Sequence, residues 1–238
     1  MGQRYHRQSG MSLYYSILNK FSRSELLRCV QAKGKDNIVV SHGGVTLEWY
    51  EAAKYPSPRT RPYIAYVGNV KPHKNLVRLV DSFIRIADVV PHDLLIVGKH
   101  EGLIKGESKE FFTRARSKKE RIHFTGEVTH EQVLALVGNA SALVLPSLYE
   151  GLGLPPLEAM AAGVPVLVSR AASLPEACGD AALYCDPLCV EDIATGIVSI
   201  LTDEPLRRRL IRAGSENVRR YSWDICAHQT ADAIRAIL

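Results

Sequence analysis

Short apolar runs alternate with helix-forming segments from residue 63 to the end of the chain, and this alternation limits the fold more than any other feature. Short continuous apolar runs bounded by polar or turn residues are typical of strands buried on both faces. The predicted strands are 63–67, 94–97, 121–125, 142–145, 164–168 and 182–185. Successive strand–helix units require a parallel sheet with helices on both faces. The sequence therefore predicts an α/β fold.

The segments between and after these strands have the apolar spacing of helices. The predicted helices are 76–88, 109–118, 130–138, 156–162, 190–201, 205–221 and 223–237. Ser222 is placed to cap the last of them, because its side chain can accept a backbone N–H bond. Residues 46–62 contain three prolines and are predicted to be a loop or linker. Upstream, residues 1–35 are helix-forming in places, and 37–41 form a short strand. The main region is one Rossmann-like domain.

A glycine-bearing loop with two carboxylates follows the predicted strand 142–145. Gly151 and Gly153 allow backbone N–H groups to approach a ligand closely. The next helix is expected to begin near Pro155 or Pro156, and its positive end suits a phosphate. Glu150 and Glu158 lie on either side of this loop. Two acids beside an anion site fit a ligand that also carries hydroxyl groups, which donate hydrogen bonds to carboxylates.

The spacing of Glu150, Gly151-Leu-Gly153 and Glu158 resembles the signature of retaining GT-B glycosyltransferases of family 4, the glycosyl transferases group 1. Residues 66–76 resemble the glycine turn and phosphate-binding lysine of that family, and 122–128 resemble its nucleotide-base loop. Further similar segments are 174–176, 179–182 and 221–223. Together they cover nearly everything from residue 63 to the end, in the order of the family.

The resemblance implies that the chain is the C-terminal, donor-binding half of a GT-B fold, with most of the N-terminal half absent. Residues 1–45 resemble a remnant of the N-terminal acceptor domain, and 46–62 resemble its linker. Residues 63–221 are then the nucleotide-sugar-binding Rossmann-like domain, and 222–238 the C-terminal helix. Because the acceptor normally binds in the N-terminal half, the chain is expected to depend on an acceptor domain elsewhere.

The resemblance also implies roles for individual residues. Lys74 would meet the diphosphate, Glu150 the transferred sugar and Glu158 the ribose hydroxyls, with Glu150 and Lys74 contributing to catalysis. The complete set of implied donor contacts is Gly68, Lys74, Gly126, Val128, Glu150, Gly151, Leu152, Gly153, Leu154 and Glu158. Read without the family, Lys74 is a surface lysine at a helix start, where the helix dipole is mildly unfavourable to it. Glu158 is then an acid in the first turn of a helix, where the dipole favours it, and Glu150 a loop acid.

One departure from the family pattern and two histidines complete the candidate residues. Many family members carry an arginine shortly before the lysine, where this chain has Asn69, Lys71 and His73. Either Lys71 substitutes for that arginine or one phosphate contact is weaker. His42 and His123 have no evident partner in the sequence and are interpreted as structural.

By resemblance, the function is transfer of a hexose, with mannose favoured, from a GDP-sugar or UDP-sugar to a glycan or lipid-linked acceptor in polysaccharide biosynthesis. The reaction retains the anomeric configuration and uses no cofactor. No Asp-x-Asp pair or ligand spacing of histidines indicates a metal. Which base, sugar and acceptor are used is left open. The alternative is a non-catalytic nucleotide-sugar-binding subunit, or an inactive truncated remnant, that needs a separate acceptor-domain chain.

Composition adds the cellular setting. Five cysteines without a Cys-x-x-Cys pair fit a reducing compartment. No apolar run approaches the ~18 residues of a membrane span, and the start lacks the apolar core of a signal peptide. The net charge of +5 does not by itself indicate nucleic acid. A cytoplasmic protein is predicted, and the basic residues near the start leave open a peripheral contact with the inner face of the membrane.

Overall fold

The computed structural model describes residues 15–17, 19–29, 38–98, 114–116 and 118–235. At its centre lies a six-stranded sheet in the order β5-β4-β3-β6-β7-β8, in which every neighbouring pair is parallel. The strands are β3 (Tyr63–Val67), β4 (Asp93–Val97), β5 (Ile122–Phe124), β6 (Ala142–Leu145), β7 (Val166–Ser169) and β8 (Leu183–Cys185). The predicted α/β class and all six predicted strands are confirmed.

The strand order reverses between β3 and β6, which lie side by side at the middle of the sheet. Ile64 pairs with Ala142, and Ala65 pairs with Leu143. The order corresponds to the doubly wound arrangement 3-2-1-4-5-6, in which ligands bind at the carboxyl ends of the two central strands. The loops that follow β3 and β6 therefore mark the place to look for a site.

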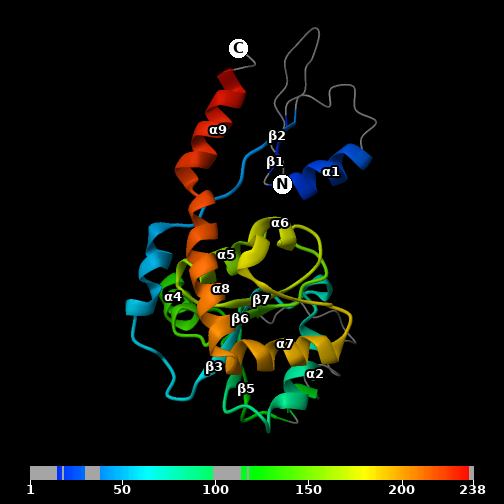
Figure 1. Cartoon of the computed structure of the whole chain (residues 1–238), viewed down its shortest axis with the longest axis vertical. Coiled ribbons are helices and arrows are strands. Elements are labelled where there is room, and N and C mark those ends of the chain that lie inside the picture. The colour runs from blue at the N-terminus through cyan, green and yellow to red at the C-terminus, as the bar shows by residue number, and fades with distance from the viewer. Residues whose placement is uncertain (1–14, 18, 30–37, 99–113, 117, 236–238) are drawn as a thin grey trace.

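Helices cover both faces of the sheet. They are α2 (Leu76–Ile86), α4 (His130–Gly138), α5 (Leu154–Ala161), α6 (Leu174–Cys178), α7 (Val190–Thr202) and α8 (Glu204–Asn217). Figure 1 shows α2 and α7 together below β6 and β7, and α5 and α6 above these two strands. Of the predicted helix 109–118, only residues 114–116, which are helical, and residue 118 lie within the described ranges.

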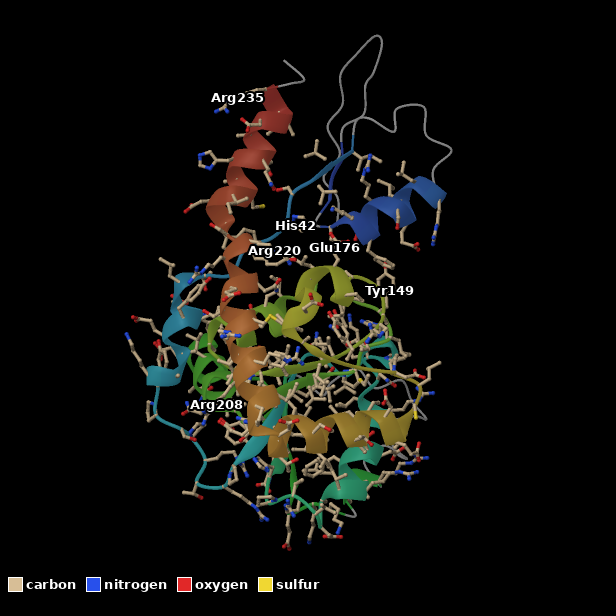
Figure 2. All side chains as sticks on the ribbon, in the orientation of Figure 1. His42, Tyr149, Glu176, Arg208, Arg220 and Arg235 are labelled. Atoms are coloured by element: carbon tan, nitrogen blue, oxygen red, sulfur yellow. The ribbon has the colours of Figure 1, made fainter. Side chains whose placement is uncertain are left out.

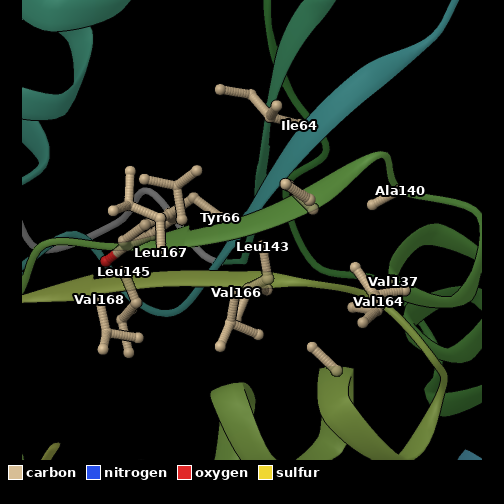
Figure 3. Close-up of a cluster of buried hydrophobic side chains, with 14 of the residues drawn as sticks. Ile64, Tyr66, Val137, Ala140, Leu143, Leu145, Val164, Val166, Leu167 and Val168 are labelled. Atoms are coloured by element: carbon tan, nitrogen blue, oxygen red, sulfur yellow. The ribbon is translucent and has the colours of Figure 1, made fainter. Parts of the chain in front are cut away.

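The core lies between the sheet and these helices. Every residue of β6 and β7 is buried, which explains why their sequences are apolar without alternation. Figure 3 shows Leu143, Leu145, Val166 and Val168 packed around these two strands. The buried Tyr63 hydroxyl donates a 2.9 Å hydrogen bond to the Leu136 carbonyl, so this large polar side chain is satisfied inside the core.

Residues 47–54 differ from the predicted loop. They form η2, a 3₁₀ helix (Leu47–Lys54), which packs against α4 and buries Trp49 and Ala52. A Cβ at Gly138 would lie 2.5 Å from the carbonyl carbon of Ala52, so only glycine permits this contact. The prolines confine the irregular backbone to residues 56–62. The first part of the predicted linker therefore belongs to the core.

A second, smaller group of elements precedes the sheet in sequence. The α1 unit consists of β1 (Tyr15–Ile17), α1 (Lys20–Cys29) and β2 (Ile38–Val40), with β1 and β2 paired in parallel. Helix α9 (Trp223–Arg235) extends from the end of α8 toward this unit (Figure 1). Ser222 accepts a hydrogen bond from the Asp224 N–H, which confirms the predicted cap. No helix in the described ranges is both long and apolar enough for a membrane span.

The connections between the α1 unit and the sheet run together. The Val45 N–H donates a 2.9 Å bond to the Tyr221 carbonyl, which joins the segment after β2 to the segment before α9. A Cβ at Gly44 would lie 2.1 Å from the backbone nitrogen of Trp223. The Ser41 hydroxyl also lies 3.1 Å from the Cys226 carbonyl of α9. The segment that leads from the α1 unit to the sheet and the segment that leads from α8 to α9 therefore lie side by side.

A buried carboxylate occupies the opposite, amino-terminal end of β4. Asp93 has only 2% of its side chain exposed, and its oxygens lie 3.1 Å from Arg59, 3.3 Å from Arg61, 3.0 Å from Arg121 and 3.1 Å from His123. This cluster joins the segment before β3 to β4 and β5. His123 therefore has a structural partner, in keeping with its interpretation from the sequence.

Candidate active site at the carboxyl edge of the sheet

Lys74 and Glu150 meet directly, although they are 76 residues apart in the chain. Lys74 ends the short 3₁₀ helix η3 (Pro72–Lys74) after β3, and Glu150 lies in the loop after β6. The Lys74 ammonium lies 2.7 and 2.8 Å from the two carboxylate oxygens of Glu150. Their side chains are 17% and 9% exposed. The two residues implied to be catalytic are thus adjacent at the reversal point of the sheet.

Buried serines hold Glu150 in place. The Ser147 hydroxyl donates a 2.7 Å bond to a Glu150 carboxylate oxygen, and the Ser169 hydroxyl donates to the Ser147 carbonyl. The negative charge of Glu150 adds to burial, the larger cause, in raising the pKa of Tyr66, which therefore stays protonated. Neither serine is among the site residues predicted from the sequence. Their positions could have indicated them, because Ser147 follows one apolar strand and Ser169 ends another, both at the carboxyl edge of the sheet.

Asn75 fixes the turn that carries Lys74. Its φ of 59° is left-handed, a conformation that asparagine tolerates better than most residues. Its side-chain amide donates to the carbonyls of Pro146 (2.8 Å) and Pro187 (2.7 Å). The Leu148 N–H also donates a 2.7 Å bond to the His73 carbonyl. The lysine turn and the Glu150 loop are therefore one connected structure, a role for Asn75 that the sequence analysis missed.

The glycine loop offers several free backbone donors. Helix α5 begins at Leu154 with Gly153 (φ 82°) as its N-cap, slightly earlier than predicted. Pro155 and Pro156 then occupy the second and third helical positions and have no N–H. Within the described part of the chain, the N–H groups of Gly151, Leu152, Gly153 and Leu154 make no hydrogen bond. Since unpaired backbone groups in buried segments are rare, these donors suit an anionic ligand.

Three glycines line the neighbouring strand ends. Gly68 follows β3 with φ 151°, Gly98 follows β4 with φ 138°, and Gly126 follows β5 with φ 71°. Gly98 and Gly126 form a bridge, and a Cβ at Gly98 would lie 2.6 Å from the Gly68 carbonyl oxygen. The predicted Gly68 and Gly126 are thus at the same edge as Lys74. Val128 is half-buried, and its side chain packs against the core.

Glu158 is a carboxylate without a partner in the described residues. It lies in α5, four residues after Leu154, and its side chain makes neither a hydrogen bond nor an ion pair there. Burial raises its pKa to about 7, and the charge of His130 offsets this only in part. A partly desolvated acid of this kind can accept hydrogen bonds from ligand hydroxyl groups.

Metal-binding side chains do not gather at this edge. In the ranges that the structure covers, no group of three or more His, Cys, Asp or Glu side chains is placed to hold a metal ion. His42 lies outside the site, with its Nε2 3.2 Å from Glu176 of α6. Lys74 and the backbone dipoles of the glycine loop supply positive charge for an anion at this edge.

The two loop glycines give a matched test of this geometry. In Gly153→Ala, the new Cβ would lie 2.8 Å from Leu174 and the φ of +82° would be strained. We expect a loss of about 1–2 kcal/mol in the free energy of unfolding by urea denaturation. At Gly151 nothing lies within 4 Å of the new Cβ, so Gly151→Ala should stay within about 0.5 kcal/mol. Equal losses would contradict the loop conformation.

Comparisons with known proteins identify the family of the chain. The family model "Glycosyl transferases group 1" matches residues 48–217. O-antigen chain mannosyltransferase B of Escherichia coli is 33% identical over 180 residues, which are 74% of this chain and 46% of that protein. Glycogen synthase of Mycobacterium tuberculosis (strain ATCC 25618 / H37Rv) is 31% identical over 206 residues, 83% of this chain and 48% of that protein. The chain spans about half the length of these curated relatives.

Solved structures show the same architecture. Sucrose-phosphate synthase from Thermosynechococcus elongatus superposes with a TM-score of 0.78 at 25% identity, over 93% of this chain and 57% of that one. WaaG, a glycosyltransferase involved in lipopolysaccharide biosynthesis, superposes with a TM-score of 0.76 at 17% identity, over 96% of this chain and 63% of that one. The second likeness concerns the fold alone. In both cases the chain matches only part of a longer structure.

Proposed function

This chain belongs to the glycosyl transferases group 1, and we propose that it is the donor-binding half of a retaining hexosyltransferase that uses a nucleotide diphosphate sugar. The contact between Lys74 and Glu150 beside the unpaired N–H groups of the glycine loop carries the proposal. The cation and the amides suit the diphosphate, and the unpartnered Glu158 suits the ribose hydroxyls. Gly126 and the Val128 backbone are proposed to meet the base.

The proposed chemistry needs no separate base in this half. The bond between the anomeric carbon and the β-phosphate oxygen breaks while the acceptor oxygen bonds to that carbon on the same face. The acceptor proton passes to the leaving phosphate. Lys74 and the loop N–H groups stabilise the negative charge that develops on the diphosphate. Glu150, oriented by Ser147, positions the sugar and stabilises positive charge at its ring.

We propose mannose as the transferred hexose and a glycan or lipid-linked acceptor. The support is the 33% identity to a mannosyltransferase of O-antigen chains. The candidate donors are GDP-sugars and UDP-sugars. A cytoplasmic location, with peripheral contact at the membrane, also belongs to this proposal. So does the division into residues 1–45, 46–62, 63–221 and 222–238, with 47–54 packed on α4.

A second candidate is a donor-binding subunit that needs an acceptor domain from a separate chain. Helix α9 favours it, because none of its residues is buried against the described part of the chain. Trp223, Ile225 and Ile234 keep 49%, 42% and 42% of their surface exposed. These side chains are available for contact with another polypeptide.

Titration calorimetry of the whole chain with GDP and with UDP tests the proposal, and Glu158→Ala is the informative variant. We expect one nucleotide to bind and Glu158→Ala to weaken it by about tenfold, since the hydrogen bonds between the ribose hydroxyls and the carboxyl group are lost. Binding of the diphosphate together with transfer from the sugar nucleotide by the chain alone would favour the enzyme over the subunit. Failure of both nucleotides to bind would overturn the donor-site proposal.

The raised pKa of Glu158 gives a pH-dependent prediction. Its pKa is about 7 in the fold against an ordinary value of 4.5, so the folded chain holds this proton more tightly than the unfolded chain. Stability is therefore expected to fall as pH rises from about 4.5 to about 7, by up to about 3 kcal/mol. Glu158→Gln should match the parent near pH 4.5 and exceed it near pH 8 in urea denaturation. Parallel pH profiles for the two proteins would contradict the shift.

A further inference from the structure

We infer that Asn19, which comes from the α1 unit, is a positioning residue of the donor site. It sets the orientation of the glycine-loop amides together with Ser173. This inference deepens the proposed function and rests on it. Neither residue belongs to the motifs that indicate the site in the sequence. Both side chains are fully buried, with 0% of their surface exposed.

Asn19 makes two hydrogen bonds of different kinds. Its side-chain oxygen accepts a 2.6 Å bond from the Ser22 N–H, so it caps the start of α1. Its side-chain amide donates to the carbonyl of Gly151 in the glycine loop. The cap fixes the rotamer of Asn19, and the fixed amide then holds Gly151. A residue 132 positions away in sequence is thus part of the loop structure.

Neighbouring contacts secure the start of α1 at this position. The carboxylate of Glu176 in α6 accepts bonds from the N–H groups of Lys20 (2.8 Å) and Phe21 (3.0 Å). The Phe21 ring packs edge to face on Tyr149, with centroids 5.6 Å apart. Figure 2 shows Glu176 and His42 close together between α6 and the α1 unit, in agreement with their 3.2 Å contact. The anchor of Asn19 therefore does not depend on a single bond.

Ser173 holds the preceding carbonyl of the same loop. Its hydroxyl donates a 2.9 Å bond to the Glu150 carbonyl. In a planar trans peptide the carbonyl and the following N–H point in opposite directions, and the described chain has no cis peptide. The Gly151 N–H therefore points away from Ser173, and the Leu152 N–H points away from Asn19. The two bonds thus fix two consecutive peptide planes, and the free N–H groups of Gly151 and Leu152 face away from α6 and α1.

The test separates diphosphate binding from binding of the rest of the nucleotide. Asn19→Ser keeps a capping hydroxyl but is too short to reach Gly151, and Ser173→Ala removes the second bond alone. Calorimetry of the full chain would compare GDP with GMP, or UDP with UMP, whichever base binds the parent. We expect about a tenfold loss of diphosphate affinity for Asn19→Ser, with less than a twofold change for the monophosphate. Ser173→Ala should act in the same direction.

Ser24→Ala is the matched control, because among the described residues the Ser24 side chain bonds only to the Phe21 carbonyl within α1. It should leave both affinities unchanged. Unchanged diphosphate affinity in both Asn19→Ser and Ser173→Ala would overturn the inference while leaving the donor site standing. Equal losses for the diphosphate and the monophosphate would also overturn it, since a merely structural role predicts them. If the parent binds no nucleotide, the proposed function fails instead, and this inference with it.

Discussion

Lys74→Met is expected to lower nucleotide diphosphate affinity by about 30- to 100-fold, the largest effect on binding that we predict from a single change. Methionine keeps the length of the side chain but removes the cation that faces Glu150. The diphosphate then loses its charged partner, and charge-assisted hydrogen bonds contribute about 1.5–3 kcal/mol each. Calorimetry with the diphosphate measures the loss directly.

The same substitution should also lower stability. Glu150 is 9% exposed and would keep only Ser147 as a side-chain partner, so we expect about 1–3 kcal/mol less free energy of unfolding. Lys118→Met is the control. Lys118 precedes β5, at the amino edge of the sheet, and forms an ion pair with the exposed Asp88. It should change neither quantity. A Lys74→Met protein that binds the diphosphate like the parent would remove the lysine from the site.

Asp93→Ala is expected to give the largest loss of stability, about 3 kcal/mol in urea denaturation. The buried carboxylate is shared by Arg59, Arg61, Arg121 and His123, so its removal leaves several positive charges without a counterion. Breaking a buried ion pair from one side typically costs 3–5 kcal/mol. The partial exposure of Arg59 and Arg61 lets them recover some hydration, which places the estimate at the lower end.

The matched control is Asp88→Ala, which removes an exposed aspartate that pairs with one lysine. Surface ion pairs contribute little, so no measurable change in stability is expected. The Asp93 cluster lies at the amino end of β4, whereas the site lies at the carboxyl edge. Asp93→Ala should therefore leave diphosphate affinity unchanged at temperatures where the variant is folded. A protein as stable as the parent would contradict the cluster.

Most of the sheet could be predicted because burial on both faces leaves a direct trace in the sequence. Strands 63–67 and 142–145 match to the residue. The apolar run predicts that β7 starts at Val164, because Val164 and Pro165 continue that run. The strand pairing begins two residues later, at Val166. The sequence predicts a linker at residues 47–54 because three prolines follow within the next eight residues. Their burial depends on α4, which lies far along the chain, and no local signal reports it.

The site could be predicted only where its residues form a local motif. Glu150, Gly153 and Glu158 share one loop and helix, and the family spacing indicates them. Asn75 and Asn19 act through backbone carbonyls of distant segments, Pro187 and Gly151. Such a contact carries no sequence signature, because a carbonyl is present at every residue. These supporting residues become visible only when the fold brings the segments together.

The close approach at Gly44 has a consequence for the whole arrangement. The segments around residues 44–45 and 221–223 lie side by side, joined by the bond from the Val45 N–H to the Tyr221 carbonyl. A side chain at residue 44 would overlap the Trp223 backbone and push these two segments apart. The seating of the α1 unit against the sheet, and of Asn19 with it, therefore depends on a residue that has no side chain.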